Sequence, residues 1–124
     1  MTTFKRAFSA KASIFSGTVA ATEALSSDLD LETSGYLGAQ VIVDVNYGTK
    51  AKYGDMAVNV YGGLGTTNYD DVAAFAQNIG SSSTPNQISM VIKDLLHFKL
   101  GFVGTSSSYG SVDANYQAWR YDTV

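Results

Sequence analysis

The chain has 124 residues, which suits a single folded domain, and 45% of them are hydrophobic against 15% charged. This balance excludes intrinsic disorder, and the absence of cysteine with a single histidine leaves little material for a thiolate metal site or a hydrolytic centre. The net charge of −3 gives no indication of nucleic-acid binding, and no apolar run approaches the roughly 20 residues that cross a bilayer. We therefore expect one domain, residues 1–124, that is not an enzyme, needs no cofactor or metal, and contacts neither nucleic acid nor membrane.

The first dozen residues form a small basic segment that precedes the first acidic residue, Glu23. Its aromatic and basic side chains are Phe4, Lys5, Arg6, Phe8 and Lys11. No place in the domain is evident for this segment. Two interpretations stay open: a frayed, solvated terminus, or residues 1–12 as an arm that reaches onto a neighbouring subunit.

A period of two dominates the rest of the chain, with apolar and polar side chains alternating as in strands that bury one face. The alternating segments, in chain order, are 13–21, 25–31, 39–47, 56–61, 88–93, 96–102 and 112–119. The first two alternate less cleanly and are expected to be edge strands. The expected core residues are Val41, Val43, Val45, Val58, Val60, Ile88, Met90, Ile92, Phe98, Leu100, Val112 and Tyr116.

Three carboxylates lie in the second of these segments or directly after it. Asp28, Asp30 and Glu32 are two residues apart, so on a strand they share one face. Such a face could hold a hard cation, but it also suits a solvated strand surface. We favour the solvated surface, because Thr33 stands where a calcium-binding EF-hand loop needs glycine.

Glycine and serine clusters separate the alternating segments and predict turns, at residues 53–55, 62–65, 80–86 and 104–108. Residues 70–78, which begin with two aspartates and contain three alanines, predict a short helix or an ordered loop over one end of the fold. Parallel strands would need longer helical crossovers. The sequence therefore predicts an all-β fold, an antiparallel two-sheet β-sandwich of the jelly-roll kind with at most one short helix.

Two features of the last strands bear on function. His97 alternates with Leu96 and Phe98, so we expect a surface histidine, and no G-x-S-x-G motif accompanies it. Trp119 and Tyr121 fall on the strand face opposite the expected core. Exposed Trp, Tyr and Arg are enriched at the energetic centres of interfaces, although Trp119 is also compatible with ordinary core.

Two stretches of the chain resemble a group of small tailed-bacteriophage virion proteins. One is a strand and a glycine-rich turn at residues 57–71, and the other comprises the strands at residues 88–102 and 112–116. The resemblance implies a jelly-roll or immunoglobulin-like sandwich that decorates a capsid or builds part of a tail. It implies as partners copies of the chain itself and other virion proteins such as the major capsid or tail proteins. The location would be the virion, assembled in the host cytoplasm, where a chain without cysteine is at no disadvantage.

Two functions are compatible with these observations: a non-enzymatic structural subunit of a virion, and a carbohydrate-binding module for attachment to a host surface. We favour the structural subunit. Open sheet edges invite pairing with other chains, so we expect a homo-oligomer. The residues expected at the interface are Phe4, Lys5, Arg6, Phe8, Trp119 and Tyr121.

Overall fold

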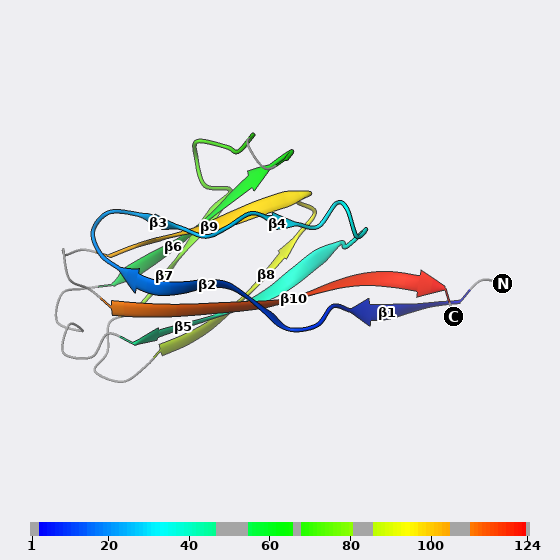
Figure 1. Ribbon diagram of the computed structural model, residues 1–124, viewed down its shortest axis with the longest axis horizontal. Coiled ribbons are helices and arrows are strands. Elements are labelled where there is room, and N and C mark those ends of the chain that lie inside the picture. The colour runs from blue at the N-terminus through cyan, green and yellow to red at the C-terminus, as the bar shows by residue number, and fades with distance from the viewer. Residues whose placement is uncertain (1–2, 47–54, 66–67, 81–85, 105–109, 124) are drawn as a thin grey trace.

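The computed structural model describes residues 3–46, 55–65, 68–80, 86–104 and 110–123. These residues form strands and no helix, and the strands make two antiparallel sheets (Figure 1). Buried side chains from both sheets fill the space between them. The expected antiparallel β-sandwich is confirmed.

The first sheet is built around one long strand, β10 (Gly110–Thr123). Its other members are β1 (Phe4–Phe8), β2 (Ala12–Val19), β5 (Gly38–Asn46) and β8 (Asn86–Lys93). The order is β1, β10, β5, β8, and β2 also pairs with β10. β2 and β1 follow one another along the same edge of β10, because β2 pairs with residues 110–116 and β1 with residues 119–123.

The second sheet has β9 (His97–Val103) and β6 (Met56–Gly63) at its centre. β7 (Phe75–Ile79) pairs with the free side of β6. On the other side, β3 (Ala24–Leu25) and β4 (Leu29–Asp30) pair one after the other with β9. The weakly alternating segment 25–31 thus supplies only two short edge pairings, because residues 26–28 lie between β3 and β4 and interrupt the strand.

The core follows the alternation expected from the sequence. Phe98, Leu100 and Phe102 of β9 are fully buried, and the valines of β5 and β6 are buried in the same core. Ile88 and Tyr116 differ from expectation in being only partly buried, although both pack against the core. The register of the central strands is therefore as predicted.

Residues 70–78, expected to be a short helix or an ordered loop, contain no helix, and their second half belongs to β7. Residues 75–79 pair with β6, and the amide groups of Asp70 and Ala74 donate hydrogen bonds to the carbonyl oxygens of Gly62 and Val60. A helix of two turns is marginal in water, whereas pairing satisfies the backbone groups along the edge of β6. Of the two expected alternatives, the helix is wrong for this reason, and residues 70–74 lie outside helices and strands.

The predicted turn at 62–65 begins later than expected, because Gly62 and Gly63 still belong to β6. The predicted turns at 53–55, 80–86 and 104–108 fall largely outside the described residues. Within the described part of the chain, no helix is long and apolar enough to cross a membrane.

Candidate functional site

The two ends of the chain form a two-stranded extension, which we call the terminal ribbon: β1 and residues 119–123 of β10. Figure 1 shows the ribbon projecting beyond the rest of the sandwich. The pairing of β10 with β5 ends at Trp119 opposite Gly38, so further out β10 pairs only with β1 among the described strands. A two-stranded ribbon is marginally stable in water by itself. The ribbon therefore offers faces and edges that a partner could cover.

Residues directly opposite one another on paired strands share a face. Phe4 lies opposite Thr123, Arg6 opposite Tyr121 and Phe8 opposite Trp119, so the aromatic residues and Arg6 occupy one side of the ribbon. We call this side the aromatic face: Phe4, Arg6, Phe8, Trp119 and Tyr121. Phe4, Phe8 and Tyr121 are 61%, 57% and 51% exposed. Three large aromatic side chains in open solvent on a narrow ribbon are a feature of interaction surfaces.

Arg6 holds the aromatic face together. Its guanidinium lies 5.8 Å from the ring centroids of both Trp119 and Tyr121, within range of a cation–π interaction. One guanidinium nitrogen also donates a hydrogen bond to the Tyr121 hydroxyl at 3.4 Å. The arginine thus orders two aromatic side chains that come from the other end of the chain.

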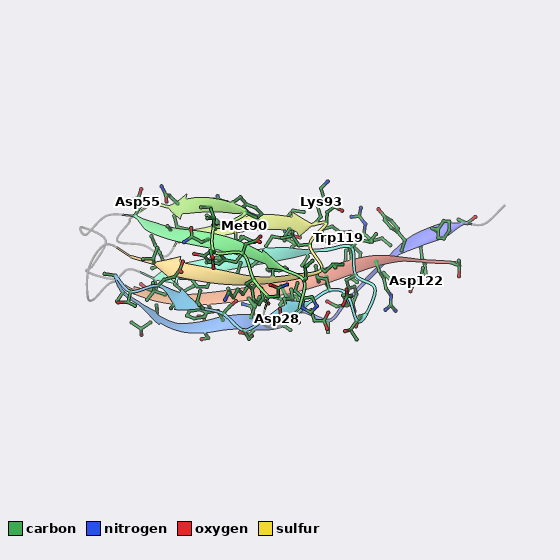
Figure 2. All side chains as sticks on the ribbon, turned by 90° about the horizontal axis from the view of Figure 1, so that it is seen from above. Asp28, Asp55, Met90, Lys93, Trp119 and Asp122 are labelled. Carbon is green, nitrogen blue, oxygen red and sulfur yellow. The ribbon has the colours of Figure 1, made fainter. Side chains whose placement is uncertain are left out.

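Trp119 is half-buried at the point where the ribbon leaves the sandwich (Figure 2). Its indole lies on Gly38 of β5, where a Cβ atom would be 2.7 Å from the ring. A glycine is required there, because any side chain would displace the indole. Beside Trp119, a hollow of about 260 Å³ on the outer side of the first sheet is lined by Phe8, Val91 and Lys93, among others. The aromatic face therefore continues onto the body of the domain.

Lys5 differs from the other expected interface residues, because it lies on the opposite side of the ribbon, paired with Asp122. The adjacent Arg120 donates a hydrogen bond from Nε to Asp122 at 3.0 Å and lies 5.6 Å from the ring centroid of Tyr36. It also donates to the carbonyl oxygen of Ser34. This side anchors the base of the ribbon to the sandwich. Five of the six expected interface residues thus share one face, and the expectation that the N-terminal segment lacks a place in the domain was wrong.

A second cluster surrounds His97, which is buried rather than exposed as the sequence predicted. Its Nδ1 lies 3.0 Å from an oxygen of Asp28, and its Nε2 lies 3.5 Å from Asp30 and 3.9 Å from Glu32. The three carboxylates share a face as expected, but β4 lies beside β9 and directs that face onto the histidine. Alternation along β9 alone could not reveal this cover, because the covering residues come from a distant segment.

The interactions in this cluster shift the pKa values of His97 and Asp30 in opposite directions. The hydrogen bond with Asp28 raises the pKa of His97, burial acts in the opposite direction, and the negative charges of Asp28, Asp30 and Glu32 raise it further. Hydrogen bonds from the Thr33 hydroxyl and amide lower the pKa of Asp30. Among the described residues, no group of three or more histidine, cysteine or carboxylate side chains has an arrangement that could hold a metal ion. The hydrogen bond between His97 and Asp28 ties the segment around β4 to β9, and protonation of His97 adds attraction to Asp30 and Glu32.

A polar contact on the outer side of the second sheet gave no sequence signal. The Glu23 carboxylate accepts hydrogen bonds from the Asn59 amide at 2.7 Å and from the Tyr61 hydroxyl at 2.8 Å. It lies over Gly101, where a Cβ atom would collide with it. Burial and the nearby carboxylate together raise the pKa of Tyr61. This contact fixes the chain just before β3 onto the sheet.

No protein-family model matches the chain, and no curated protein sequence matches it significantly. Among solved structures, a protein described as belonging to Bacillus endospore appendages, "a novel family of disulfide-linked pili", has a TM-score of 0.51 at 12% identity, over 100% of this chain and 91% of that chain. Yersinia pseudotuberculosis-derived mitogen gives 0.49 at 9% identity, over 94% and 86%. A Desmodium yellow mottle tymovirus chain gives 0.43 at 11% identity, over 100% and 90%. At 12% identity the first similarity shows the fold alone, and the other two, with TM-scores below 0.5, carry no argument.

Proposed function

We propose that this protein is a non-enzymatic structural subunit that assembles with copies of itself through the terminal ribbon. The observation that carries the proposal is the aromatic face, on which exposed side chains from both ends of the chain gather around one arginine. Aromatic residues and arginine contribute most of the binding energy in protein interfaces. A projecting ribbon with such a face is suited to contacting a second molecule.

The titratable residues outside the terminal ribbon support a structural role. The described residues with shifted pKa values are His97, Asp30 and Tyr61, and their hydrogen-bond partners are Asp28, Thr33 and Glu23. None of the three has the partner geometry of a nucleophile and base. Their chemistry ties the edges of the second sheet together. The chain contains no cysteine, so its contacts with other subunits do not include disulfides. An apolar and cationic surface suits such contacts.

The particle that we propose is a bacteriophage virion, in which the subunit decorates the capsid or forms part of the tail. This finer assignment rests on the resemblance of residues 57–71, 88–102 and 112–116 to small tailed-phage virion proteins. The partners would then be copies of this chain and the major capsid or tail proteins. The subunit would be located in the virion after assembly in the host cytoplasm.

The test of self-assembly is the oligomeric state of the purified chain, measured by native mass spectrometry and sedimentation velocity over a range of concentrations. We expect oligomers of the full-length chain, and a shift toward monomer when residues 1–12 are deleted. The deletion should leave the sandwich folded, because β1 packs on β10 and the core lies elsewhere. Val72→Asp is the matched control, since Val72 is 79% exposed on the second-sheet side of the molecule.

A full-length chain that sediments as a monomer at high concentration would contradict self-assembly. For the virion assignment, the measurement is the number of copies bound per phage particle. A deletion variant that occupies particles as well as the full-length chain would contradict a role for the ribbon in the particle.

A further inference from the structure

A groove of about 570 Å³ lies where β6 ends and β9 begins, at the end of the sandwich where the terminal ribbon leaves the first sheet. We call it the end groove. The lining residues used below are Leu64, Tyr69, Asp70, Asp94, Leu95 and Leu96. Leu64 is 71% exposed and Leu96 is 46% exposed. The groove therefore presents leucine side chains to solvent in a concave surface, which favours an apolar occupant.

The fold builds this groove from two segments that meet at the same end of the sandwich: the described residues around the end of β6 and the turn from β8 to β9. Gly63 ends β6, and a Cβ atom there would lie 2.9 Å from the ring of Tyr69, so the glycine allows the tyrosine to form one wall. The turn from β8 to β9 contains Asp94 with a φ of 64°, a left-handed conformation that aspartate tolerates better than most residues. The amide of Asp94 donates a hydrogen bond to the carbonyl oxygen of Leu37. The turn that carries Leu95 and Leu96 is thereby fixed to the body of the domain.

Negative charge surrounds the end groove. Asp70 and Asp94 line it, and Asp71 lies next to Asp70 along a neighbouring hollow that also contains Glu23. Within the described part of the chain, neither Asp70 nor Asp94 forms an ion pair. Lys99 lines the neighbouring hollow as well, with its ammonium group 4.4 Å from the ring centroid of Tyr69. An occupant that carries both apolar and cationic side chains would complement this groove.

The tip of the terminal ribbon carries both apolar and cationic side chains. Phe4 is 61% exposed and lies two residues from Arg6 on the same face, and Lys5 lies between them. Figure 1 shows the ribbon of the same molecule projecting away from its own sandwich, to which the groove residues belong. The apolar and basic tip and the apolar and acidic groove can therefore meet only between two molecules.

We propose that the end groove binds the tip of the terminal ribbon of a second copy of this chain. Phe4 of one copy would pack against Leu64 and Leu96 of the other, and Arg6 would lie beside Asp70 and Asp94. This inference rests on the proposed function and names the acceptor that the ribbon needs. The contact joins two different surfaces, so one molecule can act as donor and acceptor at once.

The test is a complementation experiment with two variants that each lose one surface. The ribbon variant is Phe4→Asp with Arg6→Glu, and the groove variant is Leu64→Asp with Leu96→Asp. All four positions are solvent-exposed, so both variants should fold, and their melting temperatures verify this. We expect each variant alone to self-associate at least about tenfold more weakly than the wild-type chain. An equimolar mixture should form 1:1 pairs in native mass spectrometry, because one intact ribbon meets one intact groove.

The outcomes separate this inference from the proposed function. If the groove variant assembles like the wild-type chain while the ribbon variant does not, the groove is not the acceptor, although self-assembly stands. A mixture that stays monomeric while the wild-type chain assembles also overturns the inference. A wild-type chain that is monomeric at every concentration overturns both proposals. Retention of the wild-type chain on a glycan array, lost in the groove variant alone, would assign the groove to carbohydrate instead.

Discussion

Phe98 provides the most direct measure of how the sandwich is held together. It is fully buried on β9, between Leu29 of β4 and Gly62 of β6 in the pairing register. Phe98→Ala removes a whole aromatic ring from this interior and leaves a cavity that the two sheets cannot fully close. We expect a loss of about 3–5 kcal/mol of unfolding free energy. For a domain of this size, with a urea m-value of about 2 kcal/mol/M, the unfolding midpoint would fall by roughly 2 M.

The matched control is the next residue, Lys99, whose side chain points to the other side of the sheet. Its ammonium group lies 4.4 Å from the ring centroid of Tyr69. Lys99→Ala should therefore cost about 1 kcal/mol or less. Shifting a strand by one residue exchanges its two faces, so these two variants test the register directly. A greater loss from Lys99→Ala than from Phe98→Ala would refute the assignment of β9 to the core.

Three further predictions concern the ribbon and the edge of the second sheet. Gly38→Ala should lower the unfolding free energy by about 1–3 kcal/mol and shift the fluorescence of the chain's single tryptophan, because the new methyl group overlaps the Trp119 ring. Gly65→Ala is the control, since a Cβ atom at Gly65 would have no atom of the described residues within 4 Å. Equal spectra for the two variants would contradict the contact. The raised pKa of His97 gives stability that is complete below its usual value of 6.5 and declines as the pH rises through the higher folded-state value. The lowered pKa of Asp30 gives stability that is complete above pH 3.8 and declines as the pH falls. The urea midpoint should thus be highest between pH 3.8 and pH 6.5, and His97→Gln should remove the decline on the alkaline side. An unchanged decline in that variant would show that His97 is not its cause. Dialysis against a chelator should leave the melting temperature unchanged, because His97 occupies the centre of the carboxylate cluster, and a decrease that calcium reverses would show a metal site there.

The sequence predicts the central strands well, because their signal is local. Val41, Val43 and Val45 alternate with polar residues, and a period of two determines which face is buried whatever the neighbouring strand is. Residues 70–78 lack such alternation, and within β7 only Ile79, directly after this segment, is buried. An edge strand with one buried residue shows no more alternation of apolar and polar residues than a short exposed helix does. Local pattern could not separate these two structures.

The candidate site depends on contacts between distant segments, which explains why only part of it could be predicted. Exposed aromatic residues and basic residues at both ends of the chain could be recognised one by one, but nothing in the sequence placed Arg6 between Trp119 and Tyr121. The same is true of His97, whose cover comes from Asp28, far away in the chain. Pairing of β1 with β10 and of β4 with β9 decides both, and such pairings are set by the whole fold.

The antiparallel pairing of the two chain ends also determines how this molecule responds to a pulling force. Phe4 lies opposite Thr123, so a force that separates the two ends acts on one residue pair at a time and opens the ribbon like a zipper. Opening can then continue into the body, because β2 follows β1 along β10. A force along the ribbon, from a neighbour that holds its tip, instead acts parallel to the strands and is shared by all the pairs between Phe4 and Phe8. A subunit held by its ribbon would therefore withstand tension along the ribbon axis and yield readily to peeling.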